Sequence, residues 1–140
     1  MTDSRAPAPP TDSLAALSEA ECRELLGTRV LGRVGMTSGG LPCILPVCYA
    51  YDDGAIVFRT GFGTKLRAAA SGDVLAFEVD DYDPQTGQGW SVMVLGRASV
   101  GTNDRDHQGL ANLDGSDDGR GHFVRLHCEM VSGRVIEAVR

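Results

Sequence analysis

The chain has 140 residues, of which 42% are hydrophobic and 23% are charged. This length and composition are typical of one soluble globular domain, and we expect no second fold. The formal net charge of −6 argues against a broad basic surface, so neither nucleic acid nor an anionic membrane is an expected partner. Because a chain of this size leaves little room for an enclosed large ligand, we expect any such ligand at a contact between subunits.

The first residues differ in composition from the rest of the chain. Residues 1–12 are rich in Pro, Ala and Ser, so we expect a mobile tail there, followed by a single domain over residues 13–140. The tail has no apolar stretch typical of a secretory signal or a membrane span, and we therefore expect a cytoplasmic protein. In that compartment all four cysteines are expected as free thiols without chemistry, each buried or half-buried.

A helix start is the first clear element in chain order. Ser18 and Glu21 form an S-x-x-E pattern, which predicts a helix N-terminus because each side chain caps a backbone N–H of the other residue. The apolar residues that follow fall on one helical face, and Gly27 is placed to end the helix. The sequence therefore predicts a short amphipathic helix over residues 18–27.

From residue 30 onward, apolar strand patterns alternate with turn signals. A second helix is expected over residues 64–70, a long polar loop over 81–89, and at most one or two helical turns over 107–113. The expected strands are residues 30–36, 41–51, 55–60, 74–80, 90–100 and 122–139, the last either as one bent strand or as two joined at Ser132-Gly133.

The links between these strands are too short for helical crossovers, so the sheet should be antiparallel. Closing such a sheet into a barrel removes its exposed edges. Pro42 and Pro46 fit poorly in a central strand because proline has no N–H for a ladder. They indicate an edge, a bulge or backbone turned toward a ligand.

The segment FRTGFGTK is the richest in candidate binding groups. It carries Arg59, Thr60, Thr64 and Lys65 around two glycines, at an expected strand-to-helix transition. Phosphate groups are bound by cationic side chains, hydroxyl donors and free N–H groups at a helix start. Leu66 breaks both the Walker pattern and G-x-G-x-x-G. On the residues alone, a phosphate site and a solvated hairpin end both stay open.

Histidine and cysteine spacing gives no metal site. His122 and His127 are five residues apart in a strand pattern, as are Cys43 and Cys48, so the two members of each pair face opposite sides. We therefore expect no bound metal, and no residue is singled out as catalytic.

The order of motifs along the chain resembles the pyridoxamine-5'-phosphate-oxidase-like flavoproteins. It consists of an apolar strand with PVxY, an acidic hairpin, FRT, G-x-K, a strand with FE, and WSVMVxGxA. The resemblance covers roughly residues 17–100, with a weaker echo in the closing strand. It implies a homodimer with FMN in clefts between the subunits. The expected fold class is mainly β, a split β-barrel of about six antiparallel strands with short peripheral helices.

The resemblance also implies which residues contact the flavin ring. Pro46, Val47, Cys48 and Tyr49 match a strand whose backbone runs along the ring, although the Tyr49 side chain equally suits a place in the core. Ser91 matches a polar residue near the ring.

For the flavin phosphate, the resemblance points to the FRTGFGTK segment. Arg59 and Thr60 match a pair that flanks the phosphate and ribityl chain, and Thr64 and Lys65 match the residues that hold the phosphate. Trp90 either stacks on the ring or covers the cleft, or it plugs one end of the barrel.

Two departures from the true oxidase bear on function. Leu66 stands where that enzyme has a second basic residue, and the chain ends without the Trp that closes on the vitamin substrate. The chain looks closer to the small, poorly characterised members, including nitroimidazole-reductase-like ones. The expected function is an FMN-dependent oxidoreductase that acts on a small molecule through flavin N5. The alternatives are a non-catalytic flavin or haem binding or carrier protein, and a deazaflavin-dependent reductase of the same fold.

Overall fold

The computed structural model describes residues 16–60, 72–101 and 122–137. The expected tail over residues 1–12 and the expected helical segments over 64–70 and 107–113 lie outside these ranges. The described elements are α2 (Glu19–Leu26), β1 (Leu31–Ser38), β2 (Leu41–Asp52), β3 (Ala55–Thr60), β4 (Val74–Asp83), β5 (Gln88–Gly101), β6 (His122–His127) and β7 (Met130–Glu137).

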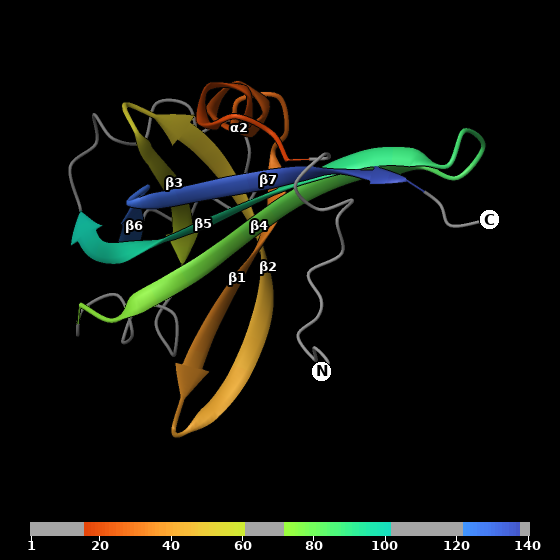
Figure 1. Ribbon diagram of the computed structural model, residues 1–140. Helices are drawn as coiled ribbons and strands as arrows, with labels where there is room; N and C mark the ends of the chain where they lie inside the picture. The colour runs from red at the N-terminus through yellow and green to blue at the C-terminus, as the bar shows by residue number, and fades with distance from the viewer. Residues whose placement is uncertain (1–15, 61–71, 102–121, 138–140) are drawn as a thin grey trace, which may run out of the picture.

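Six of these strands close into a barrel in the order β1–β2–β3–β6–β5–β4, with β4 paired back onto β1. Every pairing is antiparallel, and β7 adds to the ring from outside by pairing with β5 (Figure 1). The prediction of a mainly β, antiparallel barrel is confirmed. In the described part of the chain there is one peripheral helix, α2.

The barrel closes because two long strands each belong to two sheets. In β2, residues 41–48 pair with β1, whereas residues 49–52 pair with β3. In β5, residues 88–97 pair with β4, whereas residues 98–101 pair with β6. A strand that changes partners in this way forms a corner between two sheets.

The chain bends between β6 and β7 at Cys128-Glu129, so the predicted joint at Ser132-Gly133 is wrong. A Cβ atom on Gly96 would lie 1.7 Å from the His127 carbonyl oxygen, which shows how closely the bend crosses β5. The Arg97 N–H donates to a Glu129 carboxylate oxygen at 3.0 Å, replacing a ladder bond. Glycine at position 96 therefore leaves the room that the bend needs. Ser132 and Gly133 continue the ladder with β5.

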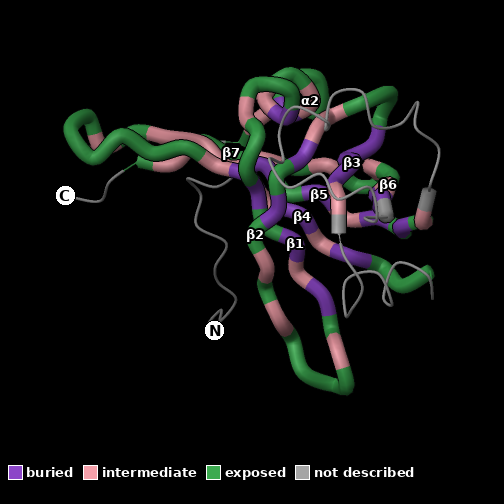
Figure 2. The backbone as a smooth tube through the Cα atoms, turned by 180° about the vertical axis from the view of Figure 1, so that it is seen from behind, coloured by how far each residue is buried: buried purple, intermediate pink, exposed green. Residues whose placement is uncertain are grey.

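The predicted polar loop over residues 81–89 is also wrong in extent. β4 continues to Asp83 and β5 begins at Gln88, with a tight turn between them. Gly87 takes a φ of 72° in this turn, and its N–H donates to the Asp83 carbonyl at 2.8 Å. The hairpin projects beyond the barrel with its tip exposed (Figure 2), so its strands lack the apolar alternation by which strands are recognised.

Alternate strand residues point into the barrel and form one core. The largest fully buried side chains there include Tyr49, Phe58 and Phe77. The predicted helix closes one end of this core with Cys22 and Leu26, both fully buried.

The predicted capping box of α2 is confirmed. The Glu21 N–H donates to the Ser18 hydroxyl oxygen at 3.1 Å, and the Ser18 N–H donates to a Glu21 carboxylate oxygen at 2.9 Å. These bonds satisfy backbone donors that a helix start would otherwise leave without partners.

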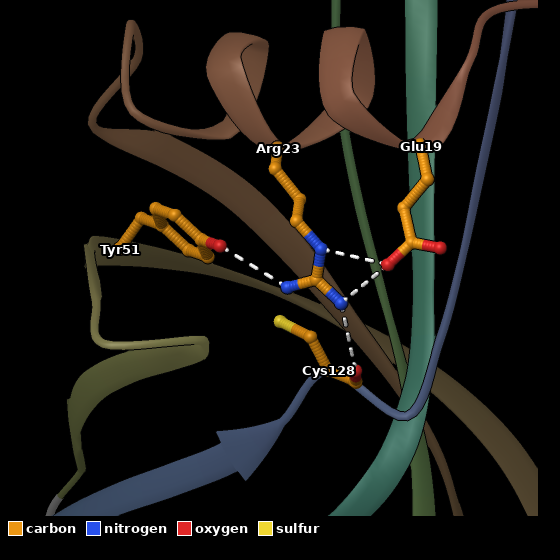
Figure 3. A network of polar contacts seen from close by, with 4 residues as sticks. All are labelled: Glu19, Arg23, Tyr51 and Cys128. Atoms are coloured by element: carbon orange, nitrogen blue, oxygen red, sulfur yellow. Dashed lines mark hydrogen bonds and ion pairs between the residues drawn. The ribbon is translucent and has the colours of Figure 1, made fainter.

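Arg23 ties α2 to the barrel (Figure 3). Its guanidinium donates to the Tyr51 hydroxyl at 3.1 Å and to the Cys128 carbonyl at 3.3 Å, and it bonds the Glu19 carboxylate at 2.9 Å through Nε. These partners belong to α2 itself, to β2 and to the bend before β7. One side chain thus joins three segments that are distant in sequence.

We predict that Arg23→Gln lowers the free energy of unfolding by about 2 kcal/mol, because it loses charge-assisted bonds to two segments of the barrel. Urea denaturation would measure the change. Glu24→Gln, one position along on an exposed part of the same helix, is the control and should change stability by less than about 0.5 kcal/mol. Equal stability of the two variants would contradict the role assigned to Arg23.

The close crossing at Gly96 gives a second stability prediction. We expect Gly96→Ala to cost about 3 kcal/mol or more, since its methyl group would displace the backbone at His127. Gly35→Ala is the matched control, because its Cβ would meet the Ala76 methyl at an ordinary 3.6 Å. Thermal denaturation of both variants would measure this, and an unchanged Tm for Gly96→Ala would contradict the close approach.

Candidate functional site

One edge of β2 carries backbone groups that point away from its partner strand. Between Leu41 and Cys48, β2 pairs only with β1 in the described part of the chain. The Tyr49 N–H donates to the Val30 carbonyl beside β1 at 2.9 Å. By the alternation of an antiparallel ladder, positions 42, 44 and 46 direct their backbone polar groups to the other edge.

Two of these three positions are prolines. Pro42 and Pro46 therefore break no bond of the β1–β2 ladder, and the prediction that they mark a strand edge is confirmed for the described residues. The carbonyl oxygens of Pro42 and Pro46 lie along this edge together with the N–H and the carbonyl of Ile44. The edge therefore offers more hydrogen-bond acceptors than donors.

The predicted ring-binding residues of β2 divide between two faces. The side chains of Pro46 and Cys48 are exposed, so the prediction of buried or half-buried cysteines is wrong for Cys48. Val47 and Tyr49 point into the core and are 5% and 1% exposed. Cys43 lies on the inward side with them, so it faces away from Cys48, as predicted. In this arrangement both side chains face the core, and by the same alternation the backbone groups of Val47 and Tyr49 point toward β1, as the Tyr49 N–H does.

The Tyr49 side chain has a structural environment of its own. Its hydroxyl donates to the Leu26 carbonyl at the end of α2 at 2.6 Å, and its ring meets Phe77 edge-on at a centroid distance of 4.7 Å. Burial raises the pKa of Tyr49 to about 12. The side chain therefore packs in the core and stays protonated.

The outward side chains of β2, β1, β4, β5 and β7 form one surface, which we call the outer sheet face. The cross-strand register defines it by two rows that run from β2 to β7: Pro46, Arg33, Glu78, Met93 and Ser132, and beside them Ile44, Gly35, Ala76, Leu95 and Met130. The flanking residues of the same face are Leu31, Cys48, Val74, Asp80, Ser91, Arg97 and Arg134.

Large apolar side chains are unusually exposed on the outer sheet face. Ile44 is 74% exposed and Met130 66%, and three further residues of the face, Val74, Leu31 and Met93, are between 43% and 58% exposed. Surfaces of this kind typically mark contacts with another protein.

Ser91 and Trp90 lie on opposite faces of β5. Ser91 pairs with Asp80 and belongs to the outer sheet face with Pro46 and Cys48. Trp90 points to the other side, where it packs against the core and the Arg29 guanidinium lies 5.4 Å from its ring centroid. Within one subunit, Ser91 therefore shares a face with the outward β2 residues but is separated from them by β1 and β4, whereas Trp90 points to the opposite face.

Arg59 lies on β3 at the outside of the barrel. Ala50 pairs with Val57, so Cys48 and Arg59, two positions further along each strand, face the same side. The Arg59 guanidinium lies 5.2 Å from the ring centroid of Phe123, its register partner on β6.

The rest of the predicted phosphate segment is only partly described. The Thr60 backbone pairs with His122. Thr64 and Lys65 lie outside the described residues, so their predicted roles stay predictions.

A charged cluster on the outer sheet face was not anticipated from the sequence. Nη1 of Arg33 lies 3.2 Å from a Glu78 carboxylate oxygen and 3.1 Å from one of Asp80. Burial and the neighbouring Asp80 raise the pKa of Glu78 to about 7, against the opposing effect of Arg33. The alternation in VLAFEVD puts both carboxylates on one face, but only the β1–β4 register brings Arg33 between them.

Two further properties concern only the described residues. They include no group of three or more His, Cys, Asp or Glu side chains arranged to hold a metal ion. None of their helices has the length and apolar character needed to cross a membrane.

Several solved structures share this fold over most of its length. The FAD binding protein from Mycobacterium smegmatis is 31% identical, with a TM-score of 0.67 over 89% of this chain and 98% of that one. A FAD-binding protein from Mesorhizobium loti is 27% identical, with a TM-score of 0.77 over 88% and 96% of the two chains.

Similarity to curated proteins is more local. An uncharacterised protein of Mycobacterium tuberculosis is 39% identical over 88 residues, which are 59% of this chain and 58% of the relative. The match therefore spans little more than half the length of that relative. The family model described as pyridoxamine 5'-phosphate oxidase matches residues 18–135, and the chain belongs to this family.

Proposed function

We propose that the chain binds a flavin nucleotide along the free edge of β2 and acts as an oxidoreductase on a small molecule. The observation that carries the proposal is the free edge of β2, where Pro42, Ile44 and Pro46 direct backbone groups away from β1. Ser91 lies on the same sheet face but on β5, with β1 and β4 between it and β2. Arg59 lies on β3 with its guanidinium against the Phe123 ring. Similarity to two FAD-binding proteins over at least 88% of the chain supports it.

The residues present fit the parts of a flavin. The edge carbonyls of β2 can accept hydrogen bonds from the ring, and the Ile44 N–H can donate one. Arg59 supplies a positive charge for the phosphate, with Thr60, Thr64 and Lys65 as further candidates. Bound flavin would supply hydride transfer at N5, while the protein orients the ring and limits its access to water.

The form of the flavin is part of the proposal. The family resemblance implies FMN, whereas the two similar proteins described above bind FAD, so both are candidates. Haem and a deazaflavin remain the alternatives. A deazaflavin with a long acidic tail is less well matched, because the net charge of −6 leaves few cations to bind it.

The experiment that tests the proposal is an absorbance spectrum of the purified protein before and after loading with FMN or FAD and desalting. Retained flavin absorbance supports the proposal, and chromatography of the released nucleotide identifies its form. A Soret band would favour haem. A spectrum with neither feature, even after loading, would refute flavin binding.

A substitution in the phosphate segment tests how the nucleotide is held. We predict that Lys65→Ala raises the dissociation constant of the flavin about tenfold, because a charge-assisted phosphate contact is lost. Quenching of flavin fluorescence on binding would measure it. Arg67→Ala, a positive charge two residues away, is the control, and equal losses in both variants would remove the specific role of Lys65.

We also propose that two copies associate through the outer sheet face. The face exposes apolar side chains from five strands, and the candidate flavin residues Pro46, Cys48 and Ser91 belong to it. Residues on one open sheet face cannot enclose a ligand on all sides, so a second copy would complete the pocket.

The dimer has a direct test. We predict a particle of twice 14.8 kDa in light scattering, and dissociation of this particle by Ile44→Asp, which places a charge on an exposed apolar residue of the face. Thr86→Asp, at the exposed β4–β5 turn, is the control and should leave the dimer intact. A monomer that retains flavin would contradict this proposal while leaving flavin binding in place.

A further inference from the structure

The Arg33–Glu78–Asp80 cluster occupies the middle of the outer sheet face. Arg33 comes from β1, and both carboxylates come from β4, the central strand of the five that form this face. One guanidinium nitrogen is shared between the two carboxylates at 3.2 and 3.1 Å. When all three groups are ionised, the cluster carries one net negative charge.

The cluster is surrounded mainly by apolar groups. Glu78 pairs with Met93 on β5, and Arg33 pairs with Pro46 on β2. Exposed apolar residues continue the face on both sides of the cluster. The other charged or titratable groups that the described strands direct to this face are the Cys48 thiol on β2, Tyr82 on β4, Arg97 on β5 and Arg134 on β7.

None of these four groups is a register neighbour of Glu78, and Tyr82 pairs with Gly89. Cys48 pairs with Leu31, Arg97 with Val74, and Arg134 with Ser91. The balance of charge around Glu78 is therefore set by Arg33 and Asp80. A single cation leaves one of the two carboxylates without full compensation.

Covering this face removes water from the cluster. Water stabilises ionised carboxylates, so its removal costs free energy unless the charge is compensated or neutralised. Two carboxylates that share one cation relieve this cost most readily when one of them binds a proton. Two copies meeting through the same face would bring two such uncompensated charges into the contact.

We infer that association through the outer sheet face is coupled to protonation of Glu78, so that the dimer tightens as the pH falls through neutrality. This inference rests on the proposed dimer and adds a regulatory property to the same surface. The linkage has a definite sign. A carboxyl whose pKa is higher in the dimer than in the monomer takes up protons on association, and proton uptake makes association stronger at lower pH.

The pH range follows from the monomer. The pKa of Glu78 is already about 7 there, because the side chain is partly buried beside Asp80. Below that value Glu78 is mostly protonated before association, and the coupling fades. Above it, and up to the higher pKa that Glu78 has in the dimer, association takes up protons, so the dissociation constant rises with pH over that interval.

Sedimentation equilibrium of the full chain, with its flavin content held constant, tests the inference. We expect the dimer dissociation constant to rise at least about tenfold between pH 6 and pH 8.5, which corresponds to a pKa change of about half a unit or more in each of two protomers. Glu78→Gln carries a neutral side chain of similar shape, and it should associate tightly with little dependence on pH. Glu24→Gln on α2 is the matched control and should behave as the unmodified chain does.

The outcomes separate this inference from the dimer itself. A dimer whose dissociation constant does not change with pH, or tightens as the pH rises, overturns the coupling and leaves the dimer standing. A monomer at every pH refutes both. A Glu78→Gln variant that retains the full pH dependence assigns the proton to another group and overturns the inference.

A second variant covers the case in which Glu78→Gln does not fold. Asp80→Asn removes the neighbouring negative charge, so it should lower the pKa of Glu78 and flatten the pH dependence over the same range. A variant that folds and still shows the unmodified dependence would equally count against the inference.

Discussion

The structure depends on two strands that each serve two sheets. β2 leaves β1 to pair with β3 after Cys48, and β5 leaves β4 to pair with β6 after Arg97. These changes of partner let six strands close into one ring. In β2, the change of partner leaves the edge opposite β1 unpaired over residues 41–48 in the described part of the chain. Residues 88–95 of β5, in contrast, are paired on both edges, with β4 and with β7.

The unpaired edge of β2 connects the fold to the proposed site. The β2 edge before the change of partner carries two prolines in positions where their missing N–H groups cost no hydrogen bond. The core packs beneath the same strand with Val47 and Tyr49, which fixes its position. A rigid strand with outward backbone groups can orient a flat ring without a dedicated side chain.

Much of the fold could be predicted because local signals agree with the final structure. The Ser18–Glu21 capping box and the apolar runs give α2 and the barrel strands directly. The bend at Cys128-Glu129 could not be predicted, because it depends on a close crossing over Gly96, distant in sequence. The candidate site is likewise predictable only in part. Alternation separates Pro46 and Cys48 from Val47 and Tyr49, whereas Arg33 meets Glu78 only through the register of β1 and β4.

The outer sheet face has two properties with opposite effects on association. Apolar exposure at Ile44 and Met130 favours association, whereas a net negative charge at its centre opposes the loss of water. If apolar side chains replaced the cluster, association would be stronger but would not depend on pH. A carboxyl whose pKa lies near neutrality makes association conditional, since a change of one pH unit alters its charge substantially. If the cofactor is held between two copies, the protonation state of Glu78 at their contact would then affect how tightly the cofactor is retained. Glu78 would do so without touching the cofactor.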